Sequence, residues 1–173
     1  MIEIVQIARE DTHIGAFDEI INMATEIEYK FLVNATAWAS IDKPKPKHIL
    51  QGFISKNEDR VVRVRVIDEQ GFLTIKGKSV GLSRSEYEYE IPKQDAEELL
   101  DQFTDKYIEK LRYEINIAGK TWEVDEFKGK LDGLILAELE VESENEEFTL
   151  PNWVTENVST DPAYYNAVLI DKC

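Results

Sequence analysis

Cysteine and long apolar runs are the most obvious scarcities in this chain of 173 residues. Its one cysteine, Cys173, excludes a disulfide framework and a thiolate metal cluster. No apolar run approaches the ~20 residues needed to span a bilayer. The first residues also lack the basic stretch and the long apolar stretch of a secretory signal. We therefore expect a cytoplasmic protein with no membrane partner.

Positive charge is scarce as well. Lysine and arginine number 20 against 35 aspartates and glutamates, which gives a formal net charge of −15. Binding to phosphate backbones usually requires a basic face, so we expect no nucleic-acid partner. This argument concerns the outside of the protein only, because a minority of cations gathered in one cavity can still bind a polyanion.

The length is that of a single domain, which we expect at residues 23–173 after an extension at residues 1–22. The extension contains "IGAFDEIINM", in which Ile14, Phe17, Ile20 and Ile21 have helical spacing. Two readings stay open. The extension is a docking helix, or it precedes a true start at Met23.

Segments with the two-residue period of a β-strand dominate the rest of the chain. Short turns separate most of these segments, which lie at residues 25–33, 48–56, 60–68, 71–78, 83–92, 106–119, 120–129 and 134–143. A helix is expected at residues 92–105, and short helices are expected in the tail at residues 151–169. About eight strands with short connections predict a mainly β (α+β) fold built on an antiparallel sheet or barrel.

Nearly every strand has one apolar face and one face of full charges. At residues 25–33, for example, Glu26, Glu28 and Lys30 alternate with Ile27 and Phe31. An open sheet with a solvated outer face is one explanation. The other is an eight-stranded antiparallel closed β-barrel, a tunnel with a charged lumen and peripheral helices. The charges on these faces come as pairs of carboxylates or pairs of cations, which favours the barrel. The interior of an eight-stranded barrel holds side chains or one small ligand.

The lumen of such a barrel would collect charges of both signs. Its cations would be Lys30, Arg63, Arg65, Lys76, Arg84, Lys110 and Arg112. Because enclosing them unpaired is costly, an anion with many oxygens would compensate them. Its carboxylates would be Glu26, Glu28, Glu123, Asp125, Glu138 and Glu140. Carboxylates bind Mg²⁺ or Mn²⁺, which also bind phosphate. The pattern therefore predicts a metal–polyphosphate site.

The ordered motifs resemble the CYTH superfamily, the triphosphate tunnel metalloenzymes. The Glu-x-Glu-x-Lys signature of that family is matched by "EIEYKFLV". Further matches follow in the expected order, at "RVRV", "LTIKGKSVGLSRSEYEYEI", "EKLRYEI", "WEVDEF" and "LAELEVES". The stretch "GLSRSEYEYEI" and the compact length are most similar to the short bacterial members with inorganic tripolyphosphatase activity.

The resemblance implies roles for these side chains in hydrolysing tripolyphosphate to pyrophosphate and phosphate. The expected metal ligands are Glu26, Glu28, Asp125, Glu138 and Glu140, with Glu86 and Glu123 in support. The expected phosphate-binding residues are Lys30, Arg63, Arg65, Lys76, Arg84 and Arg112. Lys110 is the expected catalytic residue, which positions or activates the attacking water. Two positions depart from the family pattern, Tyr29 where Arg is common and Ala167 where bacterial relatives often carry Lys.

The same set of residues is also compatible with other functions. Class IV adenylyl cyclases and thiamine triphosphatases share this fold and act on other triphosphates. A non-catalytic module that binds polyphosphate or nucleotides is a further alternative, although an intact set of acidic residues favours an enzyme. The sequence also leaves open a homodimer and the choice between Mg²⁺ and Mn²⁺.

Overall fold

The computed structural model describes residues 25–57, 59–78 and 82–173. The expected extension at residues 1–22 lies outside the described residues. The strands are β1 (Thr25–Val33), β2 (Lys47–Asn57), β3 (Arg60–Ile67), β4 (Gln70–Gly77), β5 (Ser83–Ile91), β6 (Ile108–Ile117), β7 (Lys120–Phe127), β8 (Ile135–Glu140) and β9 (Val154–Asn157). They form one sheet in the order β5-β4-β3-β2-β6-β7-β8-β1-β9, which confirms the predicted mainly β class.

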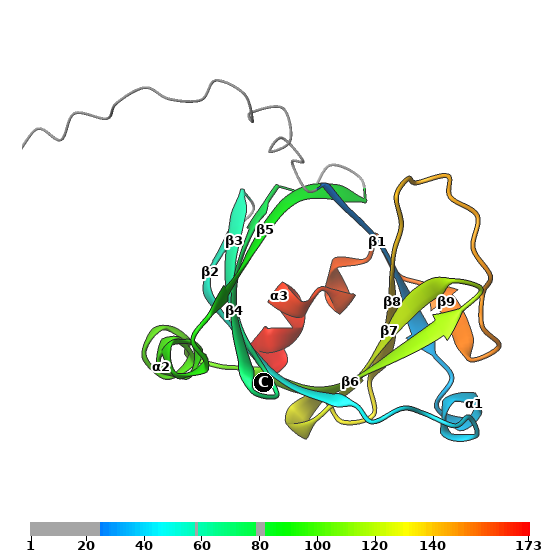
Figure 1. Ribbon diagram of the computed structural model, residues 1–173, viewed down its shortest axis with the longest axis horizontal. Helices are drawn as coiled ribbons and strands as arrows, with labels where there is room; N and C mark the ends of the chain where they lie inside the picture. Colours follow the sequence, from blue (N-terminus) through cyan, green and yellow to red (C-terminus); the bar gives the residue numbers. More distant parts are fainter. Residues whose placement is uncertain (1–24, 58, 79–81) are drawn as a thin grey trace, which may run out of the picture.

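The sheet curls into a ring (Figure 1), because β1 also pairs with β5. All of its pairings are antiparallel. The β1–β5 seam consists of three residue pairs, from Thr25–Ser85 to Ile27–Ser83. Beyond the seam β1 pairs with β8 and β9 instead. The prediction of a closed barrel is therefore corrected, since the ring is not closed along its whole length.

Helices and loops cover part of the outer face. The helices are α1 (Ala35–Ala39), α2 (Lys93–Phe103), α3 (Asn166–Leu169), η1 (Gly129–Leu131), η2 (Pro162–Tyr164) and η3 (Ile170–Lys172). The predicted helix at residues 92–105 is confirmed as α2. It packs Ala96 and Leu99 against Val64 and Val66 of β3. Gly71 permits this close approach, since a Cβ there would lie 2.8 Å from the Cβ of Ala96. No helix in the described chain has the length and apolar character to cross a bilayer.

An aromatic cluster covers the outer face of β1, β7 and β8. Its buried members include Phe31, Trp38, Trp122 and Trp153. Tyr29 also packs on this cluster, and its hydroxyl donates to the carbonyl of Glu144 at 2.7 Å. Tyr29 therefore points away from the interior of the ring, as the two-residue period predicts.

The C-terminal tail fills one end of the ring. Leu169 and Ile170 pack against Ile108, Phe127 and Leu136, which belong to the inward faces of β6, β7 and β8. Figure 1 shows α3 lying across the opening. The sequence predicts only short helices in this tail. That prediction is wrong for Val154–Asn157, which form strand β9 beside β1. The strands thus carry charged residues along one part of the lumen and apolar residues where the tail inserts.

Candidate active site

A cavity of about 1250 Å³ occupies the interior of the ring. Eleven of the predicted site residues line it, namely Glu28, Lys30, Arg63, Arg65, Lys76, Arg84, Glu86, Arg112, Glu123, Glu138 and Glu140. Asp125 and Lys110 do not line it, and both are fully buried in the wall. The side chain of Glu26 lies outside the described part of the chain. Residues far apart in sequence therefore meet in one cavity, as the strand periodicity predicts.

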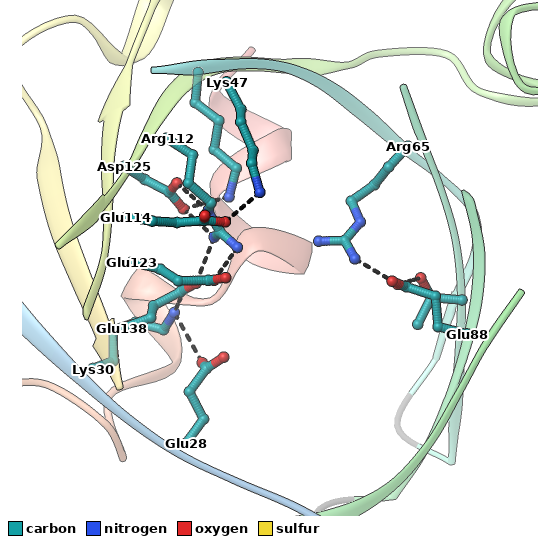
Figure 2. A network of polar contacts seen from close by, with 12 residues as sticks. Glu28, Lys30, Lys47, Arg65, Glu88, Arg112, Glu114, Glu123, Asp125 and Glu138 are labelled. Atoms are coloured by element: carbon teal, nitrogen blue, oxygen red, sulfur yellow. Dashed lines mark hydrogen bonds and ion pairs between the residues drawn. The ribbon is translucent and has the colours of Figure 1, made fainter. Parts of the chain in front are cut away.

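Arg112 of β6 is the centre of the polar network on one wall (Figure 2). Its Nε donates to Oδ1 of Asp125 at 2.7 Å, and its Nη2 donates to Oδ2 of Asp125 at 2.6 Å. The same Nη2 donates to Glu138 at 2.7 Å, while Nη1 donates to Glu123. Strand pairing explains the contacts, because Arg112 lies directly opposite Asp125 on β7, and Glu123 lies opposite Glu138 on β8.

Lys30 of β1 extends this network toward the cavity. Its Nζ donates to Glu138 and lies 3.3 Å from Oε1 of Glu28. Burial lowers the pKa of Lys30, but the negative charges of Glu138 and Glu28 outweigh burial and hold the pKa above its usual value. Burial likewise raises the pKa of Glu138, but Lys30 and Arg112 outweigh it and hold the pKa well below the usual range. Lys30 and Glu138 therefore form a charged pair at neutral pH.

Lys110 is buried behind Arg112. Its ammonium group donates to Asp125 and lies 5.7 Å from the ring centre of Phe127. Burial lowers the pKa of Lys110 to about 8, and the neighbouring charge of Arg112 acts in the same direction. Both oxygens of Asp125 are thus occupied by cations, and these cations overcome burial and lower its pKa.

Lys110 gives a testable dependence of stability on pH. Since its pKa is lower in the folded protein than in the unfolded chain, its protonation opposes folding at pH below 8. We expect its contribution to stability to rise between pH 8 and about 10.5, by up to about 3 kcal/mol. Urea unfolding of wild type and Lys110→Met across this range measures it. A difference between the two proteins that does not change with pH would contradict the assignment.

A second polar cluster faces the first one from β3, β4 and β5 (Figure 2). Glu88 is its centre, because it accepts from Nη2 of Arg65 at 2.5 Å and from the hydroxyl of Thr74 at 2.6 Å. Nearby, Lys76 pairs with Glu86 at 2.5 Å, and Nη2 of Arg63 lies 3.5 Å from the same carboxylate. Two charged walls therefore face each other across the cavity.

Several residues that line this cavity were not predicted from the sequence as site residues. Glu88 and Glu114 were visible in the strand period, since they share faces with Arg84 and Arg112. Lys47 pairs with Glu114 at 2.5 Å but lies just before the strand expected at residues 48–56. In the tail, Asp171 pairs with Lys56 and also lines the cavity. No sequence pattern indicated that the tail would enter the ring.

A divalent metal fits the carboxylates that face the cavity. Glu28 on β1 lies directly opposite Glu140 on β8, and both line the cavity. Like charges placed opposite each other repel, and a bound cation relieves the repulsion. The described residues contain no group of three or more acidic, histidine or cysteine side chains arranged around one point. Mg²⁺ does not require such a group, because it binds through one or two carboxylates together with phosphate oxygens and waters.

Comparison with known proteins shows the family of this chain. Residues 24–165 match the model of the CYTH domain. An inorganic triphosphatase of Acetivibrio thermocellus is 47% identical over 149 residues, which cover 86% of this chain and 94% of that protein. An inorganic triphosphatase of Nitrosomonas europaea is 34% identical and covers 84% of this chain and 96% of that protein.

A solved structure agrees with these sequence matches. The crystal structure of the inorganic triphosphatase NE1496 has a TM-score of 0.59 and 31% identity. The likeness covers 86% of this chain and 95% of that one. The fold, the ordered motifs and the similarity over most of the length agree, and the chain belongs to the CYTH family.

Proposed function

We propose that this protein is a metal-dependent hydrolase that cleaves inorganic tripolyphosphate to pyrophosphate and phosphate. The observation that carries the proposal is the cavity inside the ring, whose two walls present guanidinium, ammonium and carboxylate groups together. The two curated relatives described above are named inorganic triphosphatases. We also propose that the protein is cytoplasmic and binds neither nucleic acid nor membrane, in keeping with its net charge of −15.

The cations of the cavity would bind the phosphate oxygens. Arg63 and Arg65 offer planar guanidinium groups that can form paired hydrogen bonds with phosphate. Arg112 would contribute mainly positive charge, because its Nε, Nη1 and Nη2 already donate to carboxylates of the wall. Lys30, Lys76 and Arg84 add further positive charge around the same space. Held in fixed positions, these groups would stabilise the charge that develops on the phosphate oxygens in the transition state.

The carboxylates divide into two proposed roles. Glu28 and Glu140 would hold the divalent metal, with Glu26 and Glu138 beside them, and Glu86 and Glu123 in support. CYTH membership implies a divalent metal, and we propose Mg²⁺ or Mn²⁺ because oxygen ligands suit these ions. When bound, the ion would neutralise phosphate charge and help orient the attacking water. Asp125, originally expected as a ligand, would instead hold Arg112 in place.

Lys110 would contribute to the attack of water through its neighbours. Its ammonium group contacts Asp125 rather than the cavity. We therefore propose that Lys110 positions Asp125 and Arg112, so that the guanidinium group keeps a fixed orientation toward the phosphate. Direct activation of the attacking water by Lys110 would require a movement of this side chain into the cavity.

The substrate assignment is tested by comparing phosphate release from tripolyphosphate, ATP and thiamine triphosphate in the presence of Mg²⁺ or Mn²⁺. We expect tripolyphosphate to be hydrolysed with the highest kcat/KM. Faster release from thiamine triphosphate would instead favour a thiamine triphosphatase. Formation of cyclic AMP and pyrophosphate from ATP would favour a cyclase, and binding without turnover of any of the three would favour a binding module.

A further inference from the structure

The outer face of β4 and β5 carries an exposed apolar surface. Tyr87 is 44% exposed, Tyr89 is 55% exposed and Ile75 is 40% exposed. Strand pairing gathers them, because Ile75 lies directly opposite Tyr87 and Leu73 lies opposite Tyr89. Together with the half-buried Leu73, these three side chains form a patch on one sheet face of the kind that usually contacts another surface. We call these four residues the tyrosine face.

The described part of the chain leaves the tyrosine face uncovered. The nearest covering element is α2, which packs Ala96, Leu99 and Leu100 against β3 and the end of β5. Of the described strands, only β4 pairs with residues 87–91 of β5. Both the face and the adjacent backbone edge of β5 are therefore available to a further segment.

The path of the chain leads from β1 to this edge. β1 runs antiparallel to β5, with Thr25 opposite Ser85 and Glu26 opposite Arg84. If this register continued, residues before Thr25 would pass Tyr87 and Tyr89. These residues lie two and four positions beyond Ser85, which corresponds to about 7 and 13 Å along the strand. Residues 22–24 span up to about 10 Å when extended, so the preceding segment can reach the face.

That preceding segment has a matching apolar side. Ile14, Phe17, Ile20 and Ile21 have the spacing of one helix face, and Glu19 falls on the opposite face. Eight residues of helix are about 12 Å long, which matches the distance along β5 from Ser85 to Tyr89. We propose that residues 14–21 dock on the tyrosine face of the same chain, with these four apolar side chains against Tyr87, Tyr89, Ile75 and Leu73.

Cross-linking of the full chain tests this contact directly. In a Cys173→Ser background, we would introduce Phe17→Cys together with Tyr89→Cys and oxidise the protein. We expect a disulfide within one chain, seen as a monomer that is 2 Da lighter. The control pair is Phe17→Cys with Phe103→Cys, since Phe103 is 58% exposed on α2. Equal yields for the two pairs, or cross-links only between chains, would overturn the proposal, and the latter would point to a second copy as the occupant.

Hydrogen exchange provides a second test that needs no disulfide geometry. In full-length Phe17→Asp/Ile20→Asp, we expect the amides of residues 87–91 to exchange at least 10-fold faster than in wild type. Glu19→Gln should leave these rates unchanged. Unchanged rates in the double variant would refute docking. Hydrolysis of tripolyphosphate should be unaffected in all these proteins, so the outcome is independent of the proposed function.

Discussion

Replacing Glu140 with glutamine is expected to lower metal-dependent phosphate release about 100-fold or more in a protein that remains folded. Glutamine keeps the size of the side chain but removes the charge that would bind the cation opposite Glu28. A bound metal contributes several kcal/mol of charge stabilisation in such reactions, so the loss in kcat should be large. The apparent affinity for Mg²⁺, measured from the dependence of the rate on metal concentration, should fall as well.

Glu142→Gln is the matched control for this variant. Glu142 has the same chemistry and lies two residues further along the chain, but it does not line the cavity. We expect wild-type rates for Glu142→Gln. Thermal unfolding should show that Glu140→Gln remains folded, because glutamine has nearly the same size and shape as glutamate. Full activity in Glu140→Gln would rule out the metal site proposed here.

Replacing Arg112 with methionine is expected to destabilise the protein by about 3–5 kcal/mol and to abolish detectable hydrolysis. Arg112 is 7% exposed and binds Asp125, Glu123 and Glu138. Methionine fills part of the space but leaves these carboxylates with fewer cations. Burial would then raise the pKa values of Asp125 and Glu138, which the wild-type network holds low. Urea unfolding at pH 7 measures the loss of stability.

The pH dependence of the stability loss in Arg112→Met tests its electrostatic cause. Carboxyl groups with lowered pKa values stabilise the folded protein above about pH 4–5, and that contribution disappears as they become protonated. The difference between wild type and Arg112→Met should therefore be largest near pH 7 and shrink toward pH 3. As a control, Lys47→Met removes an exposed ion pair with Glu114 and should cost less than about 1 kcal/mol. Equal losses in the two variants would contradict a central role for Arg112.

The strand period predicted which face each charged residue occupies. Arg63 and Arg65, or Glu138 and Glu140, must share a face because strand side chains alternate. The register of neighbouring strands then brings these faces together inside the ring. This is why eleven of the predicted site residues line one cavity although they come from seven strands.

The period could not predict how deep each residue lies. Lys110 and Arg112 share a face of β6, yet Arg112 reaches the cavity while Lys110 is enclosed by Asp125 and Phe127. The burial depth of a side chain depends on the stagger between strands and on the side chains opposite it. The sequence of one strand contains neither kind of information. The tail was missed for a similar reason. Its short apolar segments are typical of a helix on the protein surface. In the structure, Leu169 and Ile170 instead pack against Ile108 and Leu136 inside the ring.

A divalent metal and the charged walls of the cavity are proposed to act together on a triphosphate. The most direct measurement is phosphate release from tripolyphosphate by wild-type protein in EDTA, followed by addition of Mg²⁺ or Mn²⁺ in excess. We expect at least 100-fold slower release in EDTA and recovery when metal is added. Release that continues unchanged in EDTA would contradict it.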